Sequence, residues 1–131
     1  MRRVVIDTNV LVSSFFGGKP REVLHQWRDG FLALCLSDEI LAEYLEVIAR
    51  FGDVKAEARE LLAMLSERDN VIFVSPHERM RVIPADPDGD KFLDCALAAQ
   101  AEAIISGDRH LLGLGHFRGI PILEPARFLE L

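Results

Sequence analysis

The chain has 131 residues, of which 50% are hydrophobic and 27% are charged, and these values predict one globular domain over residues 1–131 with a sizeable core. The formal net charge of −6 argues against a broad phosphate-binding surface, which usually carries a basic excess. No apolar run approaches the length of a membrane span, no signal-peptide core follows the basic start, and Cys35 and Cys95 lie in apolar stretches without a CxxC pair. We therefore expect a soluble cytoplasmic protein with reduced cysteines.

The first segment is a short β-branched run that stops at the carboxylate of Asp7. Such a run predicts a buried strand that delivers Asp7 to its carboxyl end. In an open α/β sheet this end is the edge where ligands bind, so Asp7 is the first candidate for chemistry. A brief apolar helix at residues 10–16 follows and is broken by Gly17-Gly18, and a second helix is expected at about 20–28.

The middle of the chain predicts strands on either side of two amphipathic helices. These elements are, in order, a strand at 31–36, a helix from the N-cap Ser37 to Arg50, a helix over about 54–68 and a strand at 71–74. The inward faces expected from helical spacing are Leu41, Tyr44, Leu45 and Ile48 in the first helix, and Ala58, Leu61, Leu62 and Leu65 in the second. Glu43 lies on the first of these helices.

The last part of the chain repeats the pattern of the first segment, an apolar strand that ends at a carboxylate. An extended piece at Val82-Ile83 and an acidic turn containing Asp86 and Asp88 precede a helix over about 91–100, with Asp90 and Asp94 one turn apart. A strand at 103–105 then ends at Ser106-Gly107-Asp108, and a short helix through Leu112, a strand at 120–123 and helical turns from Pro125 follow. Asp108 thus stands where Asp7 stands in the first strand.

Strands that alternate with helices predict an α/β fold with right-handed crossovers. We expect a three-layer α/β/α domain with a central, mainly parallel sheet of about five strands. Asp7 and Asp108 would then leave their strands at the same edge of the sheet. Asp94 and Glu43 come from helices that would flank this edge.

Converging carboxylates raise one another's pKa and are costly to bury without a cation. Oxygen ligands favour hard ions such as Mg²⁺ or Mn²⁺, and the four histidines show no zinc-site spacing. Such an ion activates water and stabilises the oxygens of a phosphodiester during displacement. Each acidic residue alone has a plainer interpretation as a helix cap, a turn former or a solvated side chain. Their joint occurrence favours metal-dependent phosphodiester hydrolysis.

The ordered motifs resemble the PIN domain family. They are Asp7-Thr8-Asn9-Val10 after a strand, Glu43 in its helix, Asp94-Cys95-Ala96-Leu97-Ala98-Ala99, and Ser106-Gly107-Asp108 followed by His110-Leu111-Leu112. More narrowly, they resemble the toxin ribonucleases of bacterial toxin–antitoxin modules. This resemblance implies a Rossmann-like fold, Mg²⁺- or Mn²⁺-dependent cleavage of RNA, and a homodimer or higher oligomer inhibited by a small antitoxin protein.

The resemblance also implies roles for individual residues. The acidic ligands carried over by position are Asp7, Glu43, Asp94 and Asp108, with Thr8, Asn9 and Ser106 as supporting polar residues. Asp90 is an alternative to Asp94 as the third acid, or a second contributor; Asp94 is preferred because it precedes the small-residue helix of the family pattern. Because the chain is acidic, RNA contacts are expected at a few cations, Lys19, Arg21, Lys91 and Arg109, or in a dimer groove.

Other functions are weighed against nuclease activity. A haloacid-dehalogenase-like phosphatase would need a second aspartate where Asn9 stands. A receiver-like domain would need a phosphoacceptor after a middle strand, but the strand at 71–74 ends in Ser75-Pro76. A PIN-like scaffold that binds RNA or protein without cutting remains a third hypothesis, against which the full acidic set argues.

Overall fold

A computed structural model describes residues 1–67, 69–76 and 89–131. Its strands are β1 (Arg2–Ile6), β2 (Leu32–Leu36), β3 (Val71–Phe73), β4 (Ala103–Ile105), β5 (His116–Phe117) and β6 (Ile120–Leu123). Its helices are α1 (Thr8–Ser14), α2 (Gly18–Arg28), α3 (Asp38–Phe51), α4 (Ala56–Glu67), α5 (Asp90–Ala99), α6 (Arg109–Leu112) and α7 (Pro125–Leu129). The expected pieces at Val82-Ile83 and at Asp86 and Asp88 lie outside the described residues.

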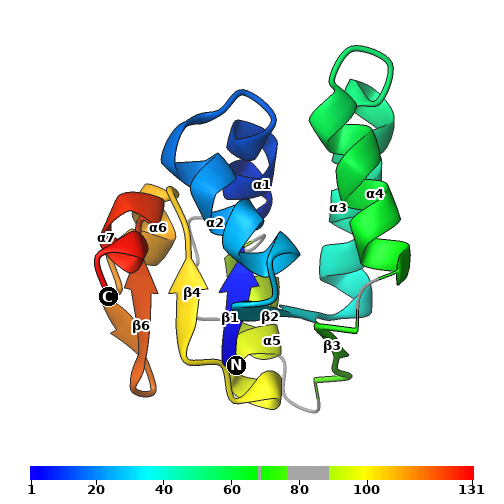
Figure 1. Ribbon diagram of the computed structural model, residues 1–131. Coiled ribbons are helices and arrows are strands. Elements are labelled where there is room, and N and C mark those ends of the chain that lie inside the picture. Colours follow the sequence, from blue (N-terminus) through cyan, green and yellow to red (C-terminus); the bar gives the residue numbers. More distant parts are fainter. Residues whose placement is uncertain (68, 77–88) are drawn as a thin grey trace.

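The strands form one sheet in the order β3-β2-β1-β4-β6-β5, and Figure 1 shows the arrows of β1, β4 and β6 rising side by side. All pairings among the described strands are parallel except β5 with β6. In β1 and β4 the final residues, Ile6 and Ile105, are direct partners. The residues that follow these two strands therefore emerge side by side.

The described sheet has six strands, whereas the sequence predicted about five. The additional strand, β5, has only two residues and is antiparallel to β6. A segment this short shows no alternation, and its turn depends on backbone that is hard to anticipate: Arg118 and Gly119 have φ angles of 48° and 84°. The tight turn folds the chain back on itself, so a segment expected to be a loop pairs with β6.

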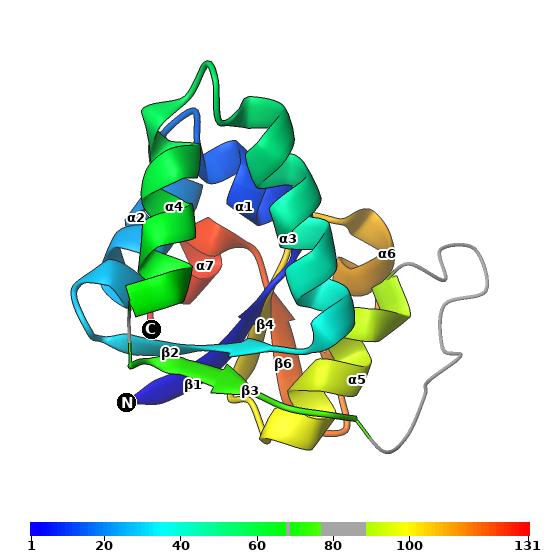
Figure 2. The same cartoon turned by 90° about the vertical axis from the view of Figure 1, so that its right-hand side faces the viewer.

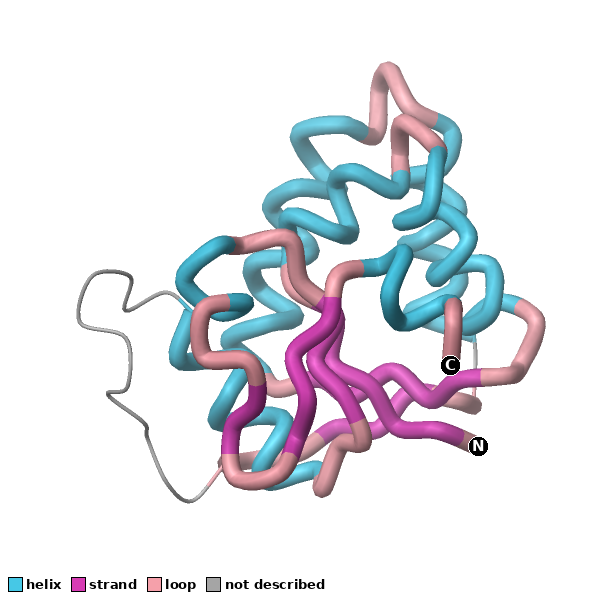
Figure 3. The backbone as a smooth tube through the Cα atoms, turned by 90° about the vertical axis from the view of Figure 1, so that its left-hand side faces the viewer, coloured by secondary structure: helices cyan, strands magenta, loops and turns pink. Residues whose placement is uncertain are grey.

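Helices flank the sheet on both faces, as the alternation of elements predicted. Helix α5 packs against β1, β2 and β4 on one face, and α2 packs on β2 from the other, together with α1 and α7 (Figures 1 and 2). Helices α3 and α4 form a hairpin beside α1 that projects beyond the sheet. Figure 3 shows the strands as one twisted sheet between the helices. Among the described residues, no helix combines the length and apolarity needed to cross a bilayer.

The core lies where the sequence placed its continuous apolar runs. Every residue of β2 is buried, and so are the last three residues of β1 and all of β4. Cys35 and Cys95 are free thiols within this core, and burial raises the pKa of Cys35 to about 11 and that of Cys95 to about 12.

The inward faces of α3 and α4 differ in detail from the prediction. Leu45 and Leu62 are 43% and 44% exposed, and Met64 is buried in place of Leu62. The buried arc of α4 passes through Ala58, Leu61 and Met64 at a spacing of three, so Leu62 is rotated away from it. Apolar spacing identified the helices but not the orientation of each about its axis.

Candidate active site

Asp7 follows β1 and caps the next helix. Its N–H donates to the carbonyl of Ile105 at 3.0 Å, which continues the β1–β4 pairing by one residue. Its Oδ1 accepts a hydrogen bond from the N–H of Val10 at 2.8 Å, so Asp7 is the N-cap of α1. The residue is 2% exposed. Strand register and helix capping together hold this carboxylate at the carboxyl edge of the sheet.

Ser106 joins Asp7 to Asp108. The Ser106 hydroxyl donates to Asp7 Oδ2 and accepts from the N–H of Asp108 at 3.0 Å. Asp108 in turn is the N-cap of α6, and its Oδ1 accepts from the N–H of His110 at 3.1 Å. One buried hydroxyl thus joins the carboxylate of Asp7 to the backbone N–H of Asp108, and these two acids follow neighbouring parallel strands.

The pKa of Asp7 is raised, chiefly because burial removes water from the carboxylate. The hydrogen bonds from Ser106, Val10 and Gly107 oppose this shift, and the negative charge of Asp108 adds to it. The charged form of Asp7 is therefore stabilised incompletely by its own surroundings. A cation placed beside both carboxylates would supply the missing compensation.

Glu43 reaches the same region from α3. It forms an ion pair with Lys91 of α5, and the two side chains are 30% and 13% exposed. The neighbouring Tyr44 is buried, and its hydroxyl donates to the carbonyl of Ile6. Helix α3 is therefore fastened to the last residue of β1, directly before Asp7.

A pocket of about 360 Å³ opens at this edge of the sheet. Its lining residues are Asp7, Thr8, Asn9, Glu43, Glu46, Val47, Arg50, Gly89, Phe92, Asp108 and Leu111. Four of these carry carboxylates, which is the convergence that the sequence predicted for Asp7, Asp108 and Glu43. The hydroxyl of Thr8 is buried and has no hydrogen-bond partner among the described residues.

Asp90 and Asp94 lie nearby on α5 but do not line this pocket. They are 8% and 6% exposed, and each interacts with other residues of the chain. Gly89, not Asp90, is the N-cap of α5, so Asp90 is its first helical residue. Both acids are therefore buried on α5, outside the lining of the pocket.

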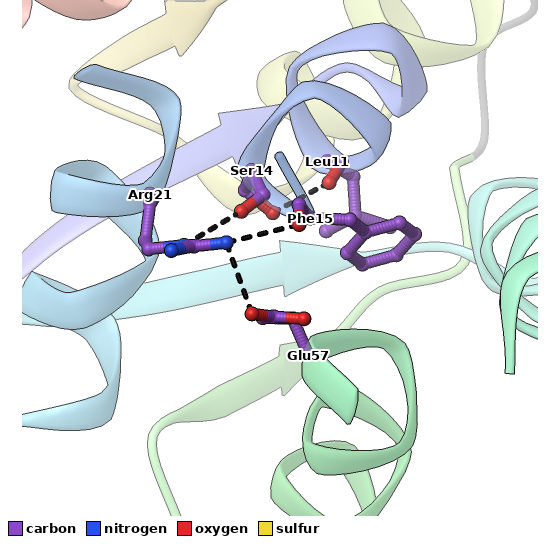
Figure 4. Close-up of polar contacts among 5 residues, drawn as sticks. All are labelled: Leu11, Ser14, Phe15, Arg21 and Glu57. Atoms are coloured by element: carbon purple, nitrogen blue, oxygen red, sulfur yellow. Dashed lines mark hydrogen bonds and ion pairs between the residues drawn. The ribbon is translucent and has the colours of Figure 1, made fainter. Parts of the chain in front are cut away.

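The cations expected to contact RNA are distributed unevenly. Lys91 pairs with Glu43 in the site, and Arg109 is exposed directly after Asp108. Lys19 pairs with Glu22 at 3.2 Å at the beginning of α2. Arg21 donates to the carbonyls of Ser14 and Phe15, at 3.1 and 2.9 Å, and to Glu57 at 3.0 Å, as Figure 4 shows.

Sequence reasoning gave no role in the site to Glu46 or Arg50, which line the pocket. Both follow Glu43 on α3, at intervals of three and seven residues. These are the intervals at which helical residues share a face. A search for polar residues at helical spacing from Glu43 would have found them.

The donor set fits a small hard cation. Among the described residues, no three His, Cys, Asp or Glu side chains are grouped closely enough to hold a common ion. Mg²⁺, however, is commonly bound by one or two carboxylates while it keeps several waters. Asp7 and Asp108 provide these two carboxylates, and the pocket provides room for water.

Comparison with known proteins identifies the family of the chain. No curated protein matches the chain, but the family described as PIN domain matches residues 3–110. This segment spans most of the chain and includes Asp7, Glu43 and Asp108. PIN domains are generally nucleases that use divalent metals. The chain belongs to the PIN domain family.

Proposed function

We propose that this PIN domain is an Mg²⁺- or Mn²⁺-dependent endoribonuclease whose ion is held by Asp7 and Asp108. The observation that carries the proposal is that Asp7 and Asp108 line one pocket at the carboxyl edge of the sheet, where Ser106 bonds the Asp7 carboxylate and the Asp108 backbone N–H. Paired carboxylates at this edge are suited to a hard cation and to a phosphate-bearing ligand.

The residues of the site divide into ligands and supports. A divalent ion bound here supplies Lewis acidity toward a phosphodiester and lowers the pKa of water. Ser106 orients the Asp7 carboxylate by donating to it and accepts from the backbone N–H of Asp108, while the N–H of His110 orients the Asp108 carboxylate. Glu43 stands on the pocket wall, where its carboxylate can complete the ligand set or orient a water molecule. Asp94 or Asp90 is the further acid of the proposed set.

The choice of RNA as substrate rests on the resemblance of the motifs to toxin ribonucleases. The same resemblance supports a role as the toxin of a toxin–antitoxin pair, with a homodimeric chain and a small antitoxin as partners. A neighbouring reading frame for a small DNA-binding protein would support this role. Its absence would leave the nuclease proposal intact and remove the toxin assignment.

Replacement of Asp7 tests the proposal. Asp7→Asn keeps a side-chain oxygen for Val10 but removes the negative charge. We expect Mn²⁺-dependent cleavage of single-stranded RNA to fall by more than the 10–100-fold that changing an outer partner of a metal ligand typically costs. Circular dichroism checks the fold. Asp53→Asn, at an exposed aspartate outside the pocket, is the matched control.

Full activity of Asp7→Asn would remove Asp7 from the proposed ligand set. Failure of the wild-type chain to bind Mn²⁺ in calorimetry would instead favour a scaffold that binds RNA or protein without cutting. Cleavage that continues at full rate in excess chelator would contradict the role of the metal.

A further inference from the structure

Arg50 is an exposed cation at the wall of the acidic pocket. It lies in the last turn of α3 and lines the pocket together with Asp7, Glu43 and Asp108. Its side chain forms no hydrogen bond or ion pair with any residue that the structure describes, and this includes Glu46, one turn before it. A guanidinium that served only to neutralise the pocket would be paired with one of these carboxylates.

The residue after Arg50 in the chain, Phe51, contacts an exposed aromatic side chain. The Phe16 ring is 61% exposed and contacts the edge of the Phe51 ring, with centroids 5.9 Å apart and planes at 89°. Lys55 Nζ lies 4.5 Å from the centroid of the Phe16 ring. We refer to Phe16, Phe51 and Lys55 as the Phe16 platform. It presents the exposed Phe16 ring on the outside of the molecule, with the Lys55 ammonium group over one face of the ring.

The pocket and the Phe16 platform are neighbours in the fold. Helices α1 and α3 pack against each other, and Figure 2 shows them side by side above the sheet. Each helix has a residue in the pocket near its beginning or middle, Thr8 and Glu43, and reaches the platform at its end. At 1.5 Å per residue, the path along α1 from Thr8 to Phe16 is roughly 12 Å. Arg50 is directly followed by Phe51.

We infer that Arg50 and the Phe16 platform bind the single-stranded part of the RNA substrate where it leaves the catalytic pocket. This inference rests on the proposed ribonuclease function and names the residues that hold its substrate. Arg50 contacts a phosphate next to the scissile bond, because a planar guanidinium matches phosphate oxygens in a bidentate manner. Phe16 stacks on a base a few nucleotides away, and Lys55 adds positive charge beside it.

The two cations at this surface, and not the net charge of the chain, favour RNA over a protein as its occupant. With a net charge of −6, the molecule repels a polyanion unless particular cations hold it. Arg50 has no partner among the described residues, and Lys55 contacts a ring rather than a carboxylate. A guanidinium that pairs with no described residue and an exposed ring at the end of the neighbouring helix suit the two parts of a nucleotide, its phosphate and its base.

The experiment measures binding and its salt dependence separately. The probe is a fluorescein-labelled single-stranded oligoribonucleotide of mixed sequence, titrated with the full chain in the Asp7→Asn background in chelator, which prevents cleavage. Anisotropy gives Kd at several salt concentrations. Arg50→Ala is expected to weaken binding about tenfold and to reduce the slope of log K against log salt by about 0.7, the value for one phosphate contact on a single strand. Phe16→Ala is expected to weaken binding about tenfold with an unchanged slope, since stacking involves no counterion.

Matched controls lie on other parts of the surface. Arg127→Ala removes one exposed cation from α7, and Phe31→Ala removes an exposed ring before β2. Both should bind the probe as the background does. Thermal melting checks that every variant is folded.

The outcomes separate this inference from the proposed function. If the wild-type chain cleaves RNA but Arg50→Ala and Phe16→Ala bind like the controls, the inference is overturned and the ribonuclease stands. If binding shows the expected losses but the wild-type chain never cleaves, the binding surface stands and the ribonuclease does not. No measurable affinity for the probe overturns the inference. The inference is also overturned if the chain self-associates in ultracentrifugation and Phe16→Ala abolishes this self-association without changing RNA affinity. The Phe16 platform would then be a contact between copies of the chain.

Discussion

Asp7 meets two requirements that conflict. As an N-cap it belongs at the start of α1, where a carboxylate accepts a backbone N–H and faces the positive end of the helix. As a buried acid beside Asp108 it has a raised pKa, because its charged form has lost water and faces a like charge. The burial that prepares Asp7 for a cation therefore destabilises the metal-free protein at neutral pH.

This conflict predicts how stability depends on pH. Because the pKa of Asp7 is raised above its ordinary value of 3.8, the folded chain binds a proton more readily than the unfolded chain. The contribution of Asp7 to the unfolding free energy therefore falls as pH rises from the ordinary value through the raised one. In chelator, Asp7→Asn should lack this contribution and should melt above the wild type at neutral pH. Melting temperatures measured from acid to neutral pH check this.

The difference in melting temperature between Asp7→Asn and the wild type should widen as pH rises from the ordinary pKa of Asp7 through the raised one, and should then stay constant. Asp53→Asn, at an exposed position, should follow the wild type at every pH. A wild-type chain that melts above Asp7→Asn at neutral pH without metal would show that the hydrogen bonds from Ser106 and Val10 outweigh desolvation.

The sequence allowed Asp7 and Asp108 to be predicted as neighbours because each follows a continuous apolar run. The role of Ser106 could not be predicted in the same way, because the sequence indicated a supporting polar residue there but not a hydroxyl that bonds the Asp7 carboxylate and the Asp108 N–H. That arrangement depends on the register of β1 with β4. Arg50 was missed because charged residues at the end of a helix are commonly solvated, and only the pocket distinguishes it from its neighbours.

At the scale of elements, one arginine joins three helices. Figure 4 shows Arg21 of α2 reaching the carbonyls of Ser14 and Phe15 at the end of α1, and Glu57 in α4. The last carbonyls of a helix have no partner within it. Arg21 donates hydrogen bonds to two of these carbonyls. The side chain that the sequence predicted to contact RNA is therefore engaged within the protein.

Removing the Arg21 side chain should destabilise the fold without a direct effect on RNA cleavage. Arg21→Ala should lower the unfolding free energy by about 2 kcal/mol, the range for hydrogen bonds that involve a charged group. Glu57→Gln keeps both carbonyl contacts and loses only a partly exposed ion pair, so it should cost less than about 1 kcal/mol. Urea denaturation gives both values. Equal losses in the two variants would show that the ion pair, not the carbonyl contacts, joins the helices.

The elements themselves were predictable because their apolar residues follow the periods of buried strands and amphipathic helices. Their ends were less so. The helix expected from about residue 54 begins at Ala56, and Val54 is 74% exposed. The start was predicted too early because, in the sequence, an apolar residue just before a helix looks like one within it. The strand β5 depends on a tight turn, and no hydrophobic pattern marks a two-residue strand.

At the scale of the whole molecule, the fold class followed from the alternation of strands and helices, since parallel strands require crossovers. The set of residues that line the pocket could not be predicted from the fold class. Five elements or their connections contribute to the lining, namely α1, α3, α5, α6 and the end of β1. Sequence spacing orders residues within one helix, but packing between helices decides which of them share a pocket.

Metal binding should appear in the stability of the entire chain. If Asp7 and Asp108 hold the ion in the folded state only, Mn²⁺ at 100 times its Kd should raise the unfolding free energy by about 2.7 kcal/mol. Differential scanning fluorimetry across a Mn²⁺ titration measures this, and Asp7→Asn should show little or no rise. An equal rise in both proteins would place the ion elsewhere on the chain.

The pairing of Ile6 with Ile105 also limits how the gene for this protein can change. Strand residues alternate between the two faces of a sheet, so gain or loss of one codon within β1 or β4 would turn Asp7 and Ser106 toward opposite faces. Exchanges among Val, Ile and Leu at these positions would leave the two acids together. We therefore expect natural variation in these strands to occur as substitution and not as insertion or deletion, with changes of length confined to the loops at the opposite edge of the sheet.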